Sequence, residues 1–168
     1  GAITGAADLA DLITACREAD ALLLADECYS DLYDDEVPPS ALQMAGPGYR
    51  NVLSYLSCSK RSGMTGYRSG AIVGDAEAIA ALRDLRSSVG VASPEFVQAA
   101  AIAAWSDDTH AAERRGIFFA KRQVLRRFFR ELGYEVVGSH AGIFMWVKVA
   151  DDMAVTERLL AAGVVVSP

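Results

Sequence analysis

The sequence predicts an α/β fold, because segments with helical periodicity alternate with short apolar runs of strand length. The first helix is expected over residues 6–19, where Leu9, Ile13 and Cys16 recur at the spacing of one helix face. The run Ala21–Ala25 follows it without alternation of apolar and polar residues. This run therefore predicts a parallel strand that is buried on both faces.

The same alternation continues along the chain. Strands are expected at 52–56, 71–73, 134–137, 143–149 and 164–166, and helices at 75–87, 94–105, 107–133 and 152–162. Asp75 and Ser93 are suitable helix caps, and Pro94 suits a first helical position. We expect residues 1–106 to belong to a parallel-sheet layer, and residues 107–168 to form a smaller α+β unit hinged through the long helix.

Composition narrows the class of protein. The 168 residues are 52% hydrophobic and 23% charged, which is typical of a globular domain with its own core. The net charge of -6 argues against a general nucleic-acid binder. No apolar run near the start is long enough to span a membrane, and no signal peptide is visible. Three cysteines without CxxC spacing suggest neither a disulfide framework nor a zinc site. A cytoplasmic protein without a metal is expected.

Both ends of the sequence suggest a fragment of a longer protein. Residue 1 is not a methionine, and the opening glycine stands in the expected turn before the first helix. The strand expected at 164–166 runs directly into Pro168.

Two predicted strand ends carry polar groups that suit an anionic ligand. Asp26 and Tyr29 follow the first strand, and the loop SCSKRSGMTGYRSG (57–70) follows the second. Ligands of open parallel sheets collect at such ends. The hydroxyls of Ser57 and Ser59 and the planar guanidinium of Arg68 would together bind an oxyanion or a phosphate.

Lys60 lies inside this loop and would supply an amine nucleophile. Nearby cations lower the pKa of a lysine, and the neutral amine forms a Schiff base with a carbonyl. Asp26 needs a cationic partner, which could be Lys60 or the protonated ring nitrogen of a cofactor. Pyridoxal phosphate requires this combination of amine, acid and anion site.

The segments DECYSDLY (26–33) and SCSKRSGMTGYRSG (57–70) resemble the fold-type I pyridoxal-phosphate aminotransferases of class I/II. The resemblance implies that Lys60 is the Schiff-base lysine and proton shuttle. It implies that Asp26 pairs with the pyridine nitrogen and that Tyr29 binds the phenolic oxygen. The remaining matched positions would hold the phosphate: Ser57, Ser59 and Arg68.

The resemblance extends to SPEFVQAAAIAAWSDD (93–108) and SHAGIFMWVKV (139–149). It implies that residues 1–106 are the C-terminal part of the large cofactor-binding domain and that residues 107–168 are most of the small domain. The family's upstream phosphate loop and Asn, and its downstream carboxylate-binding Arg, would lie outside the chain. The motifs are most similar to those of succinyldiaminopimelate transaminases of lysine biosynthesis. The implied substrates are an amino acid and a 2-oxo acid, and the implied assembly is a homodimer.

Alternative interpretations remain open for the whole chain and for single residues. The chain could be a truncated, non-catalytic form, or another fold-type I enzyme of the lyase type. Ser57 and Lys60 also match the Ser-x-x-Lys of β-lactamases, but that chemistry needs a helix where a strand and glycines are predicted, and its other motifs are missing.

Arg61 is expected to contact solvent or a second subunit. Solvated segments are expected at 34–36 and on the basic face of 121–130, with the phenylalanines of that helix (Phe128 and Phe129) in the core. No metal-ligand or nucleophilic role is expected for the two histidines and the two cysteines near the motifs: His110, His140, Cys28 and Cys58.

Overall fold

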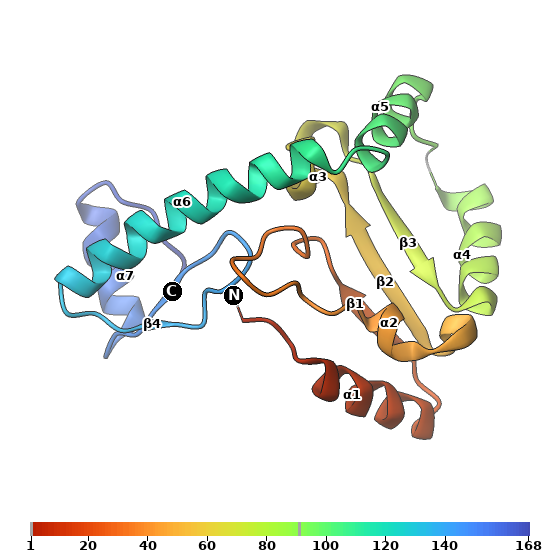
Figure 1. Ribbon diagram of the computed structural model, residues 1–168, viewed down its shortest axis with the longest axis horizontal. Coiled ribbons are helices and arrows are strands. Elements are labelled where there is room, and N and C mark those ends of the chain that lie inside the picture. The colour runs from red at the N-terminus through yellow and green to blue at the C-terminus, as the bar shows by residue number, and fades with distance from the viewer. Residues whose placement is uncertain (1, 91) are drawn as a thin grey trace.

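The computed structural model describes residues 2–90 and 92–168. A three-stranded sheet of order β1-β2-β3 lies at one end of the long helix α6, and a two-stranded sheet lies toward the other end (Figure 1). The strands are β1 (Leu23–Asp26), β2 (Val52–Ser57), β3 (Gly70–Gly74), β4 (Val136–Val137) and β5 (Trp146–Val147). The helices are α1 (Ala6–Glu18), α2 (Ala41–Ala45), α3 (Cys58–Arg61), α4 (Ala76–Val89), α5 (Glu95–Trp105), α6 (Thr109–Glu131) and α7 (Asp152–Ala161), with 3₁₀ turns η1 (Pro47–Tyr49) and η2 (Thr65–Tyr67). The α/β class is confirmed.

The larger sheet is mixed rather than fully parallel. β1 runs parallel to β2, with Asp26 opposite Tyr55. β3 runs antiparallel to β2, with Ser57 opposite Gly70. The expectation of a parallel layer is therefore wrong for this edge strand. The physical reason is the connection: α3 and η2 return the chain to the end of the sheet that it has just left, and only an antiparallel strand can start there.

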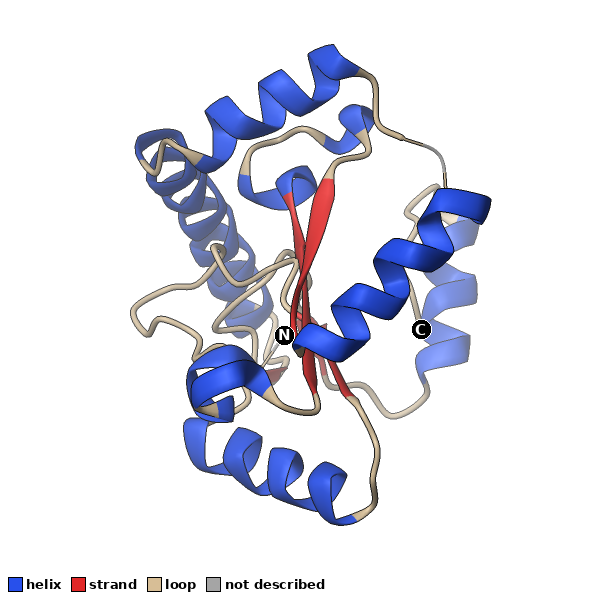
Figure 2. Cartoon of the chain, turned by 90° about the vertical axis from the view of Figure 1, so that its right-hand side faces the viewer, coloured by secondary structure: helices blue, strands red, loops and turns tan. Residues whose placement is uncertain are grey.

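The buried core lies between α1, α2 and the sheet. Ile13, Ala41, Ala45 and Val52 form it, and the β1 side chains of Leu23 and Ala25 pack against it. Helices lie on both sides of the strands, which Figure 2 shows almost edge-on. The other face of β1 is nevertheless open, because Leu24 is 59% exposed. The prediction that this strand is buried on both faces is therefore wrong within the described chain.

Helix starts follow their caps. Asp75 caps α4 as predicted, accepting hydrogen bonds from the backbone N–H groups of Glu77 and Ala78. Ser93 does not cap α5; the residue at the cap position is Pro94, and Glu95 is the first helical residue.

The segment 164–166, predicted as a strand, has no strand structure and pairs with none of the described strands. No helix in residues 2–90 or 92–168 is both long and apolar enough to cross a membrane.

Candidate functional site

The loop that carries Lys60 is closed at its base by short-range hydrogen bonds. The Ser57 side-chain oxygen accepts from the backbone N–H of Ser59 at 3.1 Å, which starts the single turn of α3. The backbone N–H of Cys58 donates to the carbonyl oxygen of Ser69 at 3.1 Å. Because the Ser57 oxygen accepts, its own O–H remains available to donate to an anion.

Arg68 ends the 3₁₀ turn η2 in a left-handed backbone conformation, with φ of 53°. Such a conformation costs a residue with a Cβ about 1–2 kcal/mol and points to a positional requirement. The Arg68 guanidinium donates from Nη1 to the carbonyl oxygen of Thr65 at 3.1 Å. The residue is exposed, and this hydrogen bond holds its side chain beside its own loop.

One cavity of about 600 Å³ brings the predicted phosphate-binding residues together. Ser57, Ser59 and Arg68 line it, beside β3 and α4. Arg83 and Arg86 of α4 also line it, and no carboxylate does so among the described residues. Hydroxyl donors and positive charge without a competing acid suit an anionic group.

Asp26 and Tyr29 line a different cavity, of about 410 Å³, together with Phe144 and Trp146 of the C-terminal unit. The edge of the Tyr29 ring packs against Phe144 with ring centroids 6.4 Å apart. The structure therefore does not bring the six predicted site residues into one cavity. It places Asp26 and Tyr29 in a cavity with Phe144 and Trp146, and the phosphate-binding candidates beside α4.

Asp26 is exposed, and its Oδ1 accepts from the backbone N–H of Cys28 at 3.1 Å. Within the described chain it has no cationic partner, so Lys60, one of the two candidate partners, does not pair with it here. A cationic partner was expected because this strand end was predicted to be buried. Because Asp26 is exposed, its carboxylate is open to water and needs no such partner.

Lys60 is half-buried and lines neither cavity. Its Nζ forms no hydrogen bond or ion pair with any residue of 2–90 or 92–168. Its carbonyl oxygen, by contrast, accepts from Nε of Arg114 at 3.0 Å. The amine is therefore placed by its backbone alone.

Cys28 lies beside Asp26 and lines the anion-suited cavity. Its thiol donates to the carbonyl oxygen of Tyr55 at 3.7 Å. Burial, then hydrogen bonding and the negative charge of Asp26, raise the pKa of Cys28 to about 11. Burial also raises the pKa of Cys58, although the positive charge of Arg61 opposes it. A raised pKa favours the protonated thiol, which is the less reactive form.

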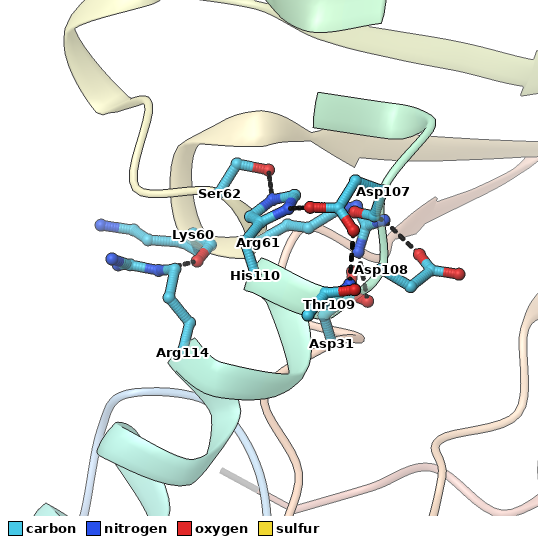
Figure 3. Close-up of polar contacts among 9 residues, drawn as sticks. All are labelled: Asp31, Lys60, Arg61, Ser62, Asp107, Asp108, Thr109, His110 and Arg114. Carbon is cyan, nitrogen blue, oxygen red and sulfur yellow. Dashed lines mark hydrogen bonds and ion pairs between the residues drawn. The ribbon is translucent and has the colours of Figure 1, made fainter. Parts of the chain in front are cut away.

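Arg61 is the residue whose role the sequence reading missed. It is 5% exposed rather than solvent-facing, so the predicted solvent contact is wrong for this chain. Its guanidinium binds Asp31 at 3.1 Å and Asp108 (Figure 3). It also lies 5.2 Å from the centre of the Trp105 ring. A buried guanidinium is stable only with such partners. The sequence offered one usable signal, the Asp107-Asp108 pair at the helix start.

The prediction of solvated segments is also wrong at Asp34. Its side chain is only 6% exposed and binds the guanidinium groups of Arg122 and Arg126. Arg122 belongs to the basic face that was expected to be solvated, and it is buried. Phe128, expected in the core, is 50% exposed. The described residues contain no group of three His, Cys, Asp or Glu side chains that could hold a metal ion.

All 168 residues match the family model described as aminotransferase class I and II. The chain is 33% identical to the 4-dedimethylamino-4-oxo-anhydrotetracycline transaminase OxyQ of Streptomyces rimosus, over 100% of this chain and 48% of that protein. It is 32% identical to LL-diaminopimelate aminotransferase 2 of Nostoc sp., over 94% of this chain and 42% of that protein.

A similar fold occurs in the crystal structure of aminotransferase AspB from Helicobacter pylori. The TM-score is 0.88 at 28% sequence identity, and the match covers 96% of this chain and 44% of that one. The chain therefore spans less than half the length of the relatives that it matches.

Proposed function

Because the chain belongs to the class I and II aminotransferase family, we propose that the protein containing it transfers an amino group between an amino acid and a 2-oxo acid, using pyridoxal 5'-phosphate. The family depends on this cofactor. The observation that carries the proposal is that Ser57, Ser59 and Arg68 line one cavity beside the helix that bears Lys60.

The donor set fits the cofactor at its phosphate end. The cavity offers two hydroxyls and arginine side chains without a carboxylate among its described lining residues. When bound, pyridoxal phosphate supplies an aldehyde that an amine can capture and a ring that accepts electrons. In our proposal Lys60 would hold the cofactor through Nζ and would carry the substrate α-proton. Asp26 would keep the ring nitrogen protonated, and Tyr29 would donate to the ring oxygen.

The substrate proposed is related to diaminopimelate. The motif resemblance favours N-succinyl-diaminopimelate in lysine biosynthesis, and the similarity to LL-diaminopimelate aminotransferase 2 supports a substrate of this chemical class. We propose a cytoplasmic location for this chemistry. We also propose that residues 1–106 contribute to the cofactor-binding domain and residues 107–168 to the small domain.

A homodimer, which is typical of the family, is proposed for the whole protein. The accessible surface of this chain is 11108 Å² for a mass of 17.9 kDa. A compact monomer of that mass is expected to expose only about 8,000 Å². The excess includes large apolar side chains such as Leu24, Phe96 and Ile102. It supports the proposal that further protein surface covers this chain.

The test uses the complete gene product that contains these residues. Added pyridoxal phosphate should produce a visible absorbance band, and borohydride reduction should fix the cofactor on one lysine, identified by peptide mass spectrometry. The chain contains only three lysines, Lys60, Lys121 and Lys148. Lys60→Ala should abolish the label, whereas Lys121→Ala and Lys148→Ala should retain it. A product in which no lysine is labelled would refute the proposed function.

The same experiment separates the alternatives. Transfer of the amino group to a 2-oxo acid distinguishes an aminotransferase from a lyase, which would release a cleaved product. Residues 1–168 expressed alone address the non-catalytic alternative. Labelling of Lys60 without turnover in that polypeptide, together with turnover in the complete product, would assign the cofactor contact to this chain and catalysis to the whole.

A further inference from the structure

Four consecutive residues, Lys60 to Gly63, contact the junction between α5 and α6 (Figure 3). Nε of Arg114 donates to the Lys60 carbonyl oxygen at 3.0 Å. The Ser62 hydroxyl lies 2.8 Å from Nε2 of His110. A Cβ at Gly63 would lie 2.7 Å from Nη1 of Arg114, so the glycine leaves the space that this side chain occupies.

Arg61 anchors the same segment most strongly. Its Nη2 donates to the carbonyl oxygen of Asp107 at 3.3 Å and to the Asp108 carboxylate, and its Nη1 donates to Asp31 at 3.1 Å. Since the guanidinium is 5% exposed, losing these partners would leave a charge in a site with little water. The backbone next to Lys60 is therefore held in one place.

His110 continues the link to the helix start. Its Nδ1 lies 3.0 Å from Oδ2 of Asp107, and this hydrogen bond is the main reason that the pKa of Asp107 is well below its usual range. An ionised carboxylate only accepts, so Nδ1 carries the proton in this pair, and Nε2 shares a hydrogen bond with the Ser62 hydroxyl. The chain of contacts thus runs from the helix start to the Lys60 segment.

A Ser–His–Asp order also occurs in hydrolases, but it carries no hydrolytic role here. Ser62, His110 and Asp107 line neither of the two cavities described above. The backbone N–H of Ser62 already donates to the Cys58 carbonyl oxygen at 2.9 Å, so it is not available to stabilise an oxyanion. These contacts act as a structural link.

The link matters because Nζ of Lys60 has no partner within the described chain and is placed through its backbone alone. His110 and Arg114 are four residues apart and therefore share a face of α6. The far end of α6 lies beside the small two-stranded sheet (Figure 1). We propose that His110 and Arg114 are positioning residues for Lys60, through which the orientation of α6 sets the position of the lysine amine. The catalytic part of this statement rests on the function proposed for Lys60.

The first test needs no cofactor. The complete gene product is acetylated briefly with acetic anhydride, and the rates at Lys60, Lys121 and Lys148 are followed by mass spectrometry. Arg114→Gln should change the rate at Lys60 by about twofold or more, because amine exposure and pKa respond to small displacements. The matched control is Arg115→Gln, whose guanidinium stacks over Tyr33 at 4.4 Å and does not contact the loop. It should leave all three rates unchanged.

The second test uses the cofactor-loaded protein. The pH midpoint of the cofactor absorbance band should shift by about half a pH unit or more in Arg114→Gln, and not in Arg115→Gln. Arg114→Lys, which keeps a donor, should show a smaller shift than Arg114→Gln. Ser62→Ala, a milder change that cuts the His110 contact, should shift the midpoint in the same direction and covers the case that Arg114→Gln does not fold.

The outcomes separate the two proposals. If the acetylation rate of Lys60 in Arg114→Gln and in Ser62→Ala equals that in the unchanged protein, the positioning proposal is overturned. If the rates change as expected but neither the unchanged protein nor any variant forms the absorbance band, the positioning proposal stands and the proposed function fails.

Discussion

The carboxylate of Asp34 accepts hydrogen bonds from the guanidinium group of Arg122, which lies 88 positions later in the sequence. The side chains are 6% and 4% exposed, and Nε of Arg122 lies 2.9 Å from Oδ1. Arg122 also donates to the Gly142 carbonyl oxygen at 2.6 Å. Arg122 in the middle of α6 thus joins the loop after β1 through an ion pair and the segment before β5 through a hydrogen bond.

Replacement of Asp34 by alanine should lower the free energy of unfolding by about 3–5 kcal/mol, because it leaves the buried charge of Arg122 without its partner. Urea denaturation followed by circular dichroism measures the change. Asp35→Ala is the matched control, since Asp35 is the exposed neighbour and should change stability by less than about 0.5 kcal/mol. Equal effects of the two substitutions would contradict a stabilising role for the buried pair.

The sequence predicted those features that depend on local spacing. The Asp75 cap, the helix expected over 6–19 and the strand expected at 52–56 follow from residues next to one another, and the structure contains them as Ala6–Glu18 and Val52–Ser57. The α/β class follows from their order. The motif residues were identified from their place at predicted strand ends and from the resemblance to the aminotransferases, and three of them line one cavity.

Other features depend on tertiary contacts that no local pattern reveals. Asp34 and Asp35 are alike in sequence, yet only Asp34 meets two arginines from α6. Arg61 is buried because the junction between α5 and α6 returns to the loop at Asp107, 46 positions later. The direction of β3 depends on how the 57–70 loop folds back. Spacing alone could not predict these pairings.

Asp75 should make the stability of the protein depend on acidic pH. Hydrogen bonds from the N–H groups of Ala78, Asn51 and Glu77 lower its pKa, and burial partly opposes them. A lowered folded-state pKa stabilises fully above the unfolded value of about 3.9, and this contribution is lost as pH falls through the folded value. Asp75→Ala should therefore cost about 1 kcal/mol at pH 7 and less below about pH 4.

Urea denaturation at a series of pH values checks this prediction. Asp75→Asn, which keeps a cap acceptor without the charge, should cost less at pH 7 and show a flatter dependence on pH. A cost of Asp75→Ala that stays constant from pH 7 to pH 3 would argue against the ionised cap.

Replacement of Gly74 by a residue with a side chain should destabilise the protein, because the Gly74 backbone lies against β2. A Cβ there would lie 2.0 Å from the Val52 carbonyl oxygen, and φ is +149°. Gly74→Ala should destabilise the protein by about 3 kcal/mol or more through this overlap and backbone strain. Gly66→Ala is the control, since a Cβ there meets no atom within 4 Å and φ is not in the left-handed region. Thermal unfolding of both variants measures the difference. Similar melting temperatures would show that β3 accommodates a Cβ at position 74.

The thiol of Cys28 should react slowly at neutral pH and faster as pH rises toward about 11, because the thiolate is the reactive form. A Cys16→Ser background isolates it, since Cys58 is fully buried. The negative charge of Asp26 contributes to the raised pKa, so Asp26→Asn should lower the pKa of Cys28 and increase its labelling rate at pH 8. Iodoacetamide labelling followed by mass spectrometry measures both rates. An unchanged rate in Asp26→Asn would mean that burial alone sets the pKa of this thiol.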